Sequence, residues 1–70
     1  MMPLLVAPQG EPQIIKRVGG RDEMKKHLND LGFVPGGEIT VVSDLNGNLI
    51  VNVKDARVAI NKELAGKIFV

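Results

Sequence analysis

The sequence predicts a mainly β protein with a single domain, residues 1–70, in which short strands curl into a small barrel around one inserted α-helix. Val and Ile make up 15 of the hydrophobic residues, which are 44% of the chain, and β-branched side chains favour strands. The 8 glycines and 4 prolines interrupt the chain at short intervals, which is typical of several short strands. So many short strands must close their edges, as small barrels do.

Two short strands are expected at the N-terminal end. The first is an edge strand over Leu4–Ala7, followed by a turn at Pro8-Gln9-Gly10. The second runs over Gln13–Val18, with Ile14 and Val18 on one face and Ile15 on the other.

One helix is predicted over Asp22–Leu31. Asp22 is expected to be its N-cap, because a carboxylate accepts hydrogen bonds from the free amide groups of a first helical turn. Met24, Leu28 and Leu31 recur at helical spacing and form its apolar stripe. Gly32 is expected in the left-handed conformation after the helix, which places Phe33 against Leu28 in a Schellman ending.

Three strands joined by hairpins should follow a type II turn at Val34–Gly37. The first is Glu38–Leu45, with Ile39, Val41 and Leu45 facing inward. Asn46-Gly47, the strongest two-residue hairpin signal, leads into Asn48–Lys54. A second tight turn is placed at Asp55-Ala56, before a strand over Arg57–Ile60. The remaining elements are a helical turn over Lys62–Ala65, capped by Asn61 and closed by Gly66, and a last strand over Lys67–Val70 that pairs back onto the sheet.

Composition excludes several function classes. The chain has no cysteine, so disulfides, thiolate metal sites and cysteine nucleophiles are excluded. A net charge of +1 and the lack of Trp and Tyr argue against nucleic-acid binding. No apolar run is long enough to cross a bilayer and no signal peptide is recognised, so a cytoplasmic protein without direct membrane insertion is expected.

Few residues could carry chemistry. Glu23 and His27 are four residues apart on the predicted helix and are weak candidates for a divalent metal such as Fe²⁺, with a solvated helix face as the alternative. Ser43 and Thr40 have no histidine near them in sequence, so an enzyme is not expected. Gly19-Gly20 precedes a helix, as phosphate-binding loops do, but the P-loop pattern is absent and turn roles are favoured. No cofactor is expected.

The helix end and the turn after it are the candidate partner-binding surface. Leu31, Val34 and Pro35 are placed at an apolar tip beside the basic face of Lys25 and Lys26, which resembles the apolar centre and charged rim of protein interfaces. Pro35 stiffens the loop and so reduces the entropy lost on binding. Core and turn roles for these residues, and a simple solvated face for the lysines, are the alternatives.

The chain resembles FeoA, the small cytosolic component of bacterial ferrous iron transport. The matching elements cover nearly the whole chain, and the most specific is the string Leu31-Gly32-Phe33-Val34-Pro35-Gly36, followed by Arg57-Val58-Ala59. Further matches include Gly19-Gly20, His27-Leu28, Ile39-Thr40-Val41, Gly47–Val51 and Ile68–Val70. Two residues depart from the family pattern: Asp55 stands where Gly is frequent, and Asn61 stands where a basic residue is common.

The resemblance implies an SH3-like β-barrel with an inserted helix and an accessory role in iron homeostasis. The expected partner is FeoB, the membrane permease with a cytoplasmic GTP-binding domain, which would recruit the chain to the inner face of the membrane. Transition metal binding and weak self-association are left open. The same barrel forms the C-terminal domain of metal-dependent repressors, so a detached repressor domain is the alternative function, together with a weak divalent-metal carrier.

Overall fold

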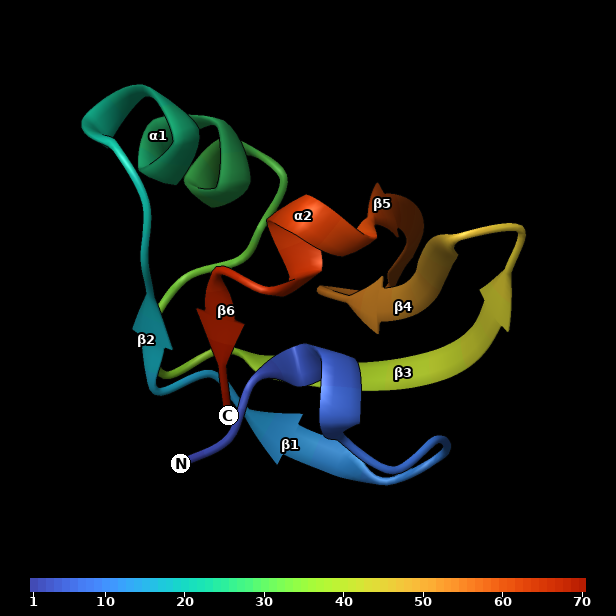
Figure 1. Cartoon of the computed structure of the whole chain (residues 1–70). Helices are drawn as coiled ribbons and strands as arrows, with labels where there is room; N and C mark the ends of the chain where they lie inside the picture. The colour runs from blue at the N-terminus through green and yellow to red at the C-terminus, as the bar shows by residue number, and fades with distance from the viewer.

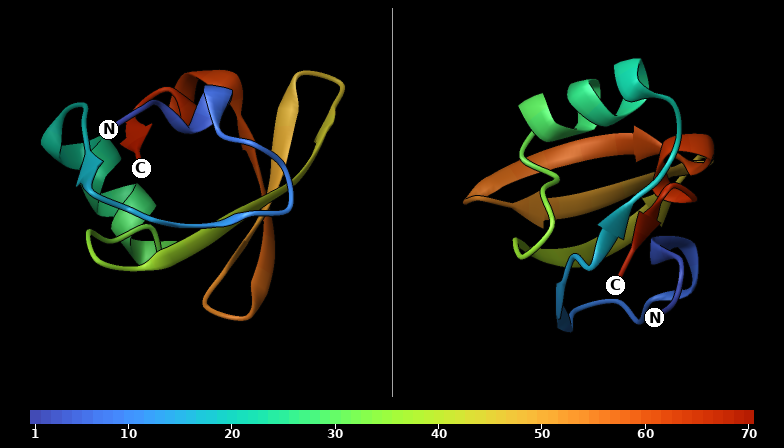
Figure 2. Two further views of the ribbon diagram at one scale, coloured as in Figure 1. Left: turned by 90° about the horizontal axis from the view of Figure 1, so that it is seen from below. Right: turned by 90° about the vertical axis from the view of Figure 1, so that its left-hand side faces the viewer.

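The computed structural model describes residues 1–70 and confirms a mainly β architecture with one substantial helix (Figure 1). Its elements in chain order are η1 (Leu4–Val6), β1 (Pro12–Ile14), β2 (Arg17–Val18), α1 (Asp22–Asp30), β3 (Glu38–Leu45), β4 (Asn48–Val53), β5 (Ala56–Asn61), α2 (Lys62–Ala65) and β6 (Ile68–Phe69). They form a four-stranded antiparallel sheet in the order β1-β3-β4-β5 and a two-stranded sheet of β2 and β6. Figure 2 shows the strands curling around a common interior.

One core of 13 buried hydrophobic residues fills this interior. The predicted inward face of the hairpins is confirmed at Ile39, Val41, Leu49, Val51 and Val53, none more than 4% exposed. Buried residues from other elements complete the core: Leu4, Ile15, Leu28, Phe33, Ile60, Ala65, Ile68 and Val70. Every element except β1 and β2 contributes a residue to this single core.

Leu45, predicted to face inward, is 59% exposed, and that prediction is wrong. The reason is a register shift between Val41 and Ser43, which leaves Val42 as an extra residue in β3. Because side chains alternate with a period of two, one extra residue exchanges the two faces beyond it. Asp44 then pairs with the buried Leu49, and Leu45 turns to solvent.

The two hairpin turns differ in how well their residues suit them. Asn46-Gly47 forms the predicted turn, with φ angles of 52° and 83°. The second turn lies at Lys54-Asp55 and not at Asp55-Ala56, because Val53 pairs with Ala56 and closes the hairpin one residue earlier. Lys54 and Asp55 have φ angles of 50° and 63°, so a residue with a side chain, Asp55, stands at the second central position, where such a turn normally has Gly.

The strand predicted over Gln13–Val18 is two strands. Its chain changes partner in the middle: the Ile15 N–H donates to the Gly37 carbonyl, and the next N–H, of Lys16, donates to Phe69. β1 therefore belongs to the larger sheet and β2 to the smaller one. Ile15, at the corner, is buried, whereas Ile14 is 49% exposed. The last strand, β6, pairs with β2 rather than with the larger sheet.

The first segment is not an edge strand. Leu4–Val6 is a 3-10 helix, in which the N–H groups of Val6 and Ala7 donate to the carbonyls of Pro3 and Leu4, respectively. These local bonds bury Leu4 and leave Leu5 and Val6 exposed. The strand-like pairing occurs earlier, where Met2 and Val70 exchange two backbone hydrogen bonds of 2.8 Å. The two chain ends therefore lie side by side (Figure 1).

Helix α1 begins and ends close to the predicted positions, with a different N-cap. Arg21 is the N-cap, and its carbonyl accepts the first helical bond, from the Lys25 N–H. Asp22 already has helical backbone, so it favours the helix through the first-turn dipole and not by capping. At α2 the predicted cap is confirmed, since the Leu64 N–H donates to Asn61 Oδ1 at 2.8 Å. Neither helix is long and apolar enough to span a membrane.

Candidate partner-binding surface

An open groove lies between β2, α1 and the turn after the helix. It has a volume of about 370 Å³ and is lined by Val18 of β2, by Lys25, Lys26 and Asn29 of α1, and by Phe33 and Pro35 of the turn. Three segments, β2, α1 and the turn after the helix, therefore meet at one depression. Its lining is apolar at the bottom and charged at the rim.

The end of α1 builds the floor of this groove. Gly32 has a φ of 104°, the Phe33 N–H donates to the Leu28 carbonyl at 2.9 Å, and the Gly32 N–H donates to the Asn29 carbonyl at 3.0 Å. This pair of bonds is the predicted Schellman motif. It turns the chain back under the helix, so Phe33 is only 1% exposed and still forms part of the groove wall.

The type II turn places the other apolar wall. Gly36 has a φ of 88°, and the Gly37 N–H donates to the Val34 carbonyl at 2.9 Å, so Pro35 occupies the first central position as predicted. Pro35 is exposed and lines the groove. Val34 is half-buried beside Gly37, with its Cγ2 3.4 Å from where a Gly37 Cβ would stand, and it does not line the groove.

The rim of the groove carries positive charge without a partner. Lys25 and Lys26 are both exposed. The single ion pair in the protein joins Lys62 to Asp44, 3.7 Å apart, so neither rim lysine has a carboxylate within 4.0 Å. Asn29 adds a side-chain amide that makes no hydrogen bond within the protein. The rim groups are therefore available to carboxylates from outside.

The structure brings together Lys25, Lys26 and Pro35 of the predicted surface and separates Leu31 from them. Leu31 follows Asn29 by two residues, which is about 200° around the helix axis, and it is 36% exposed on the other flank. Val18, Asn29 and Phe33 line the groove but are not among the predicted surface residues, Phe33 being expected only as a core contact of Leu28. Val18 has no local signal for this role, since only the tertiary fold places β2 beside α1.

Glu23 and His27 lie on the flank of α1 away from the groove, and both are exposed. Their four-residue spacing is as predicted, with one helical turn between them. No group of three or more His, Cys, Asp or Glu side chains that could hold a metal ion is found in the structure. The pair thus has two protein ligands to offer, fewer than the three or four of typical zinc sites.

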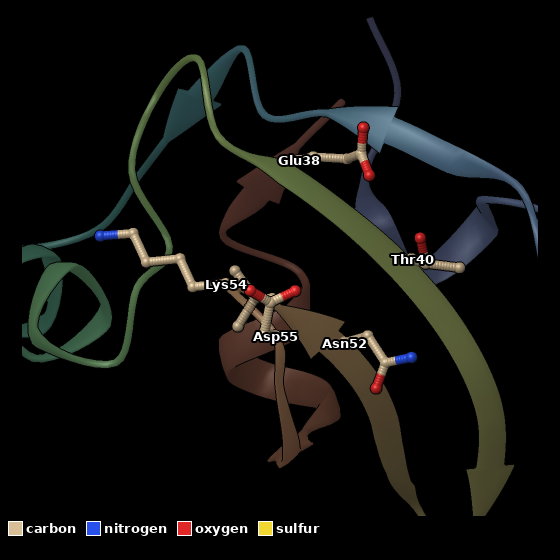
Figure 3. Close-up of a pocket in the computed structure, with 6 residues that line it drawn as sticks. Glu38, Thr40, Asn52, Lys54 and Asp55 are labelled. Atoms are coloured by element: carbon tan, nitrogen blue, oxygen red, sulfur yellow. The ribbon is translucent and has the colours of Figure 1, made fainter.

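A second, polar depression of about 500 Å³ lies on the outer face of the larger sheet (Figure 3). Its lining residues are Glu38 and Thr40 of β3, Asn52 and Val53 of β4, and Lys54 and Asp55 of the second turn. In Figure 3 the end of the Lys54 side chain points away from the other labelled residues. The Thr40 hydroxyl has no histidine beside it, because the lone histidine is on α1. The arrangement of a nucleophile and an oriented base that covalent catalysis needs is not formed here.

Comparisons with known proteins agree on one family. A family model described as FeoA domain matches residues 2–70. A curated protein of Methanocaldococcus jannaschii that carries the name Fe(2+) transport protein A is 33% identical over all of this chain, and the match covers 85% of that protein. The crystal structure of an iron uptake regulatory protein, FeoA, is 31% identical with a TM-score of 0.87, over 96% of this chain and 89% of that one.

The fold has the SH3-like architecture that the resemblance implies. FeoA of Stenotrophomonas maltophilia, described as an SH3 domain protein and complexed with zinc, superposes with a TM-score of 0.85 at 26% identity over 100% of this chain and 89% of that chain. A manganese-dependent transcriptional repressor has a TM-score of 0.86 at 18% identity, over 97% of this chain and 39% of the repressor. That second likeness shows a shared fold and nothing about function.

Proposed function

The chain belongs to the FeoA domain family of ferrous iron transport proteins, and from this we propose that it is an accessory module that acts on a FeoB-like permease by protein–protein contact. It works at the cytoplasmic face of the membrane, where the GTP-binding part of the permease is accessible. The family is one of transport proteins and not of enzymes.

The groove between β2, α1 and the turn is the observation that supports contact as the mode of action. Its buried aromatic floor, exposed proline and charged rim match the composition of protein interfaces, in which an apolar centre is surrounded by polar groups. Phe33 and Pro35 are held by a Schellman motif and a type II turn, so little ordering is needed when a partner binds.

A titration of the purified chain against the cytoplasmic part of the permease tests this proposal. Calorimetry is carried out with the permease fragment in its GDP-bound, GTP-analogue-bound and nucleotide-free states, because a regulatory contact should depend on the state of the GTP-binding domain. Saturable binding in at least one state supports the proposal. Absence of binding in all three states refutes it.

The alternative function, a metal carrier, predicts a different result in a calorimetric titration. If Glu23 and His27 held cargo, titration with Fe²⁺ under anaerobic conditions would give tight binding that His27→Ala abolishes. The accessory module predicts that His27→Ala leaves permease binding unchanged, because His27 lies on the flank of α1 away from the groove.

A further inference from the structure

We propose that the groove receives an acidic segment of the permease, in which one apolar side chain is flanked by carboxylates. This inference rests on the proposed function and specifies its chemistry: the apolar side chain enters against Phe33, Val18 and Pro35, and the carboxylates meet Lys25 and Lys26. The contact with the permease is thereby confined to the groove side of α1, the side that carries Lys25, Lys26 and Asn29.

The apolar part follows from the size and floor of the groove. A volume of about 370 Å³ lies near the lower end of the roughly 300–1,000 Å³ that ligand pockets occupy, so it suits an anchoring side chain better than a large cofactor. Phe33 is only 1% exposed, so it forms a rigid floor and adds little surface of its own. The apolar surface that a partner side chain can cover belongs to the half-buried Val18 and the exposed Pro35, and removing that surface from water favours binding.

The acidic part follows from the unpaired charges. Lys25 and Lys26 lie next to each other at one rim, and neither has a carboxylate within 4.0 Å. Two neighbouring ammonium groups repel each other, and a carboxylate from a partner relieves that repulsion as well as adding its own attraction. The lysine stems can lie along apolar surface while their ends remain at the rim, so both contacts can form together.

Other occupants fit the site less well. Net charge is only +1 and there is no Trp or Tyr, whereas single-stranded nucleic acid is usually held by a basic groove with several aromatic platforms. An anionic membrane surface would contact a broad, flat basic face, but the lysines here border a depression with an apolar floor. The exposed Leu31, on the opposite flank with Glu23 and His27, does not lie on the groove side of α1.

Charge-reversal variants of the full chain, titrated against the cytoplasmic part of the permease, test this inference. Lys25→Glu/Lys26→Glu should weaken binding at least tenfold, a loss of about 1.4 kcal/mol, and binding by the parent should weaken as salt is raised. Arg57→Glu/Lys62→Glu is the control for net charge, because it changes the charge equally at exposed residues of β5 and α2. It also removes the ion pair of Lys62 with Asp44, but both side chains of that pair are about half exposed, so the pair contributes little to stability. Binding by this control should stay within about twofold of the parent, since neither residue lines the groove.

A gain-of-binding variant excludes misfolding as the explanation. Asn29→Lys places a third ammonium group at the rim and should tighten binding severalfold. If the parent binds but the two double variants have the same affinity as each other, the inference is wrong and the proposed function stands. The same conclusion follows if Asn29→Lys weakens binding. If the parent does not bind, the proposed function is wrong and the inference falls with it. Lys25→Glu/Lys26→Glu variants that lose retention on phosphatidylglycerol vesicles while keeping permease binding would assign the lysines to a membrane and overturn the inference.

Discussion

The backbone at the end of α1 connects the core to the proposed surface through two residues, Leu28 and Phe33. Leu28 is fully buried, and its carbonyl accepts the N–H of Phe33, which is at once a core residue and the floor of the groove. A change at either residue therefore affects stability and the shape of the site together. Variants meant to test binding alone must be chosen from the exposed rim.

Leu28→Ala should lower the free energy of unfolding by about 2–5 kcal/mol, as truncations of buried leucines do. In a domain of 70 residues such a loss is a large fraction of total stability. Urea denaturation followed by circular dichroism measures it. Leu31→Ala is the control, since Leu31 is 36% exposed and should cost much less. Equal losses at the two positions would show that the buried face of α1 is assigned incorrectly.

Gly32→Ala should also destabilise the protein, by about 1–2 kcal/mol, because the φ of 104° is unfavourable for any residue with a Cβ. An added Cβ would lie 3.3 Å from Lys54 Cδ, a flexible side chain that can move aside. Gly36→Ala separates the two effects, since Gly36 has a similar φ and nothing within 4 Å of the added atom. Thermal denaturation should give comparable losses for both variants, and an unchanged midpoint for Gly32→Ala would contradict this account of the helix end.

At the level of elements, the sequence predicts those that depend on one residue type at one position. The Schellman end, the type II turn, the Asn46-Gly47 hairpin and the Asn61 cap each have a residue type that the local backbone requires, and all four were predicted. Two differences are local, namely the 3-10 helix at Leu4–Val6 and the N-cap at Arg21. The other three lie where tertiary pairing decides the outcome. The corner at Ile15, the extra residue Val42 and the turn at Lys54-Asp55 have no local marker, because each is imposed by the strand beside it.

One substitution in the second hairpin turn should make the protein more stable. Asp55→Gly should raise the free energy of unfolding by up to about 1.5 kcal/mol, because the left-handed strain that it removes, ~1–2 kcal/mol at most, exceeds the ~0.5–1 kcal/mol of added chain entropy. Lys54 is kept, since its stem lies beside Gly32. A higher thermal midpoint is the expected result. A lower one would mean that Asp55 makes a stabilising interaction that outweighs the strain.

At the scale of the whole molecule, the site exists only in the folded state. Lys25, Lys26 and Pro35 could be proposed from the sequence, because an exposed helix face and a proline turn have local signals. Val18 could not, since it lies in a two-residue strand whose position beside α1 depends on pairing with β6, close to the C-terminal end of the chain. Binding at the candidate surface therefore depends on the pairing of β2 with β6 as well as on the rim residues of α1.

The central claim, that this groove is the surface that meets the permease, is tested most directly by nuclear magnetic resonance. The ¹⁵N-labelled chain is titrated with the cytoplasmic part of the permease, and changes in the backbone amide signals are mapped onto the structure. We expect the largest changes to cluster at Val18, Lys25, Lys26, Asn29 and Phe33, while the signals of Leu45 and Arg57 remain nearly unchanged. Changes centred on the β3–β4 hairpin or on the polar depression around Thr40 and Asn52, with the groove unaffected, would contradict it.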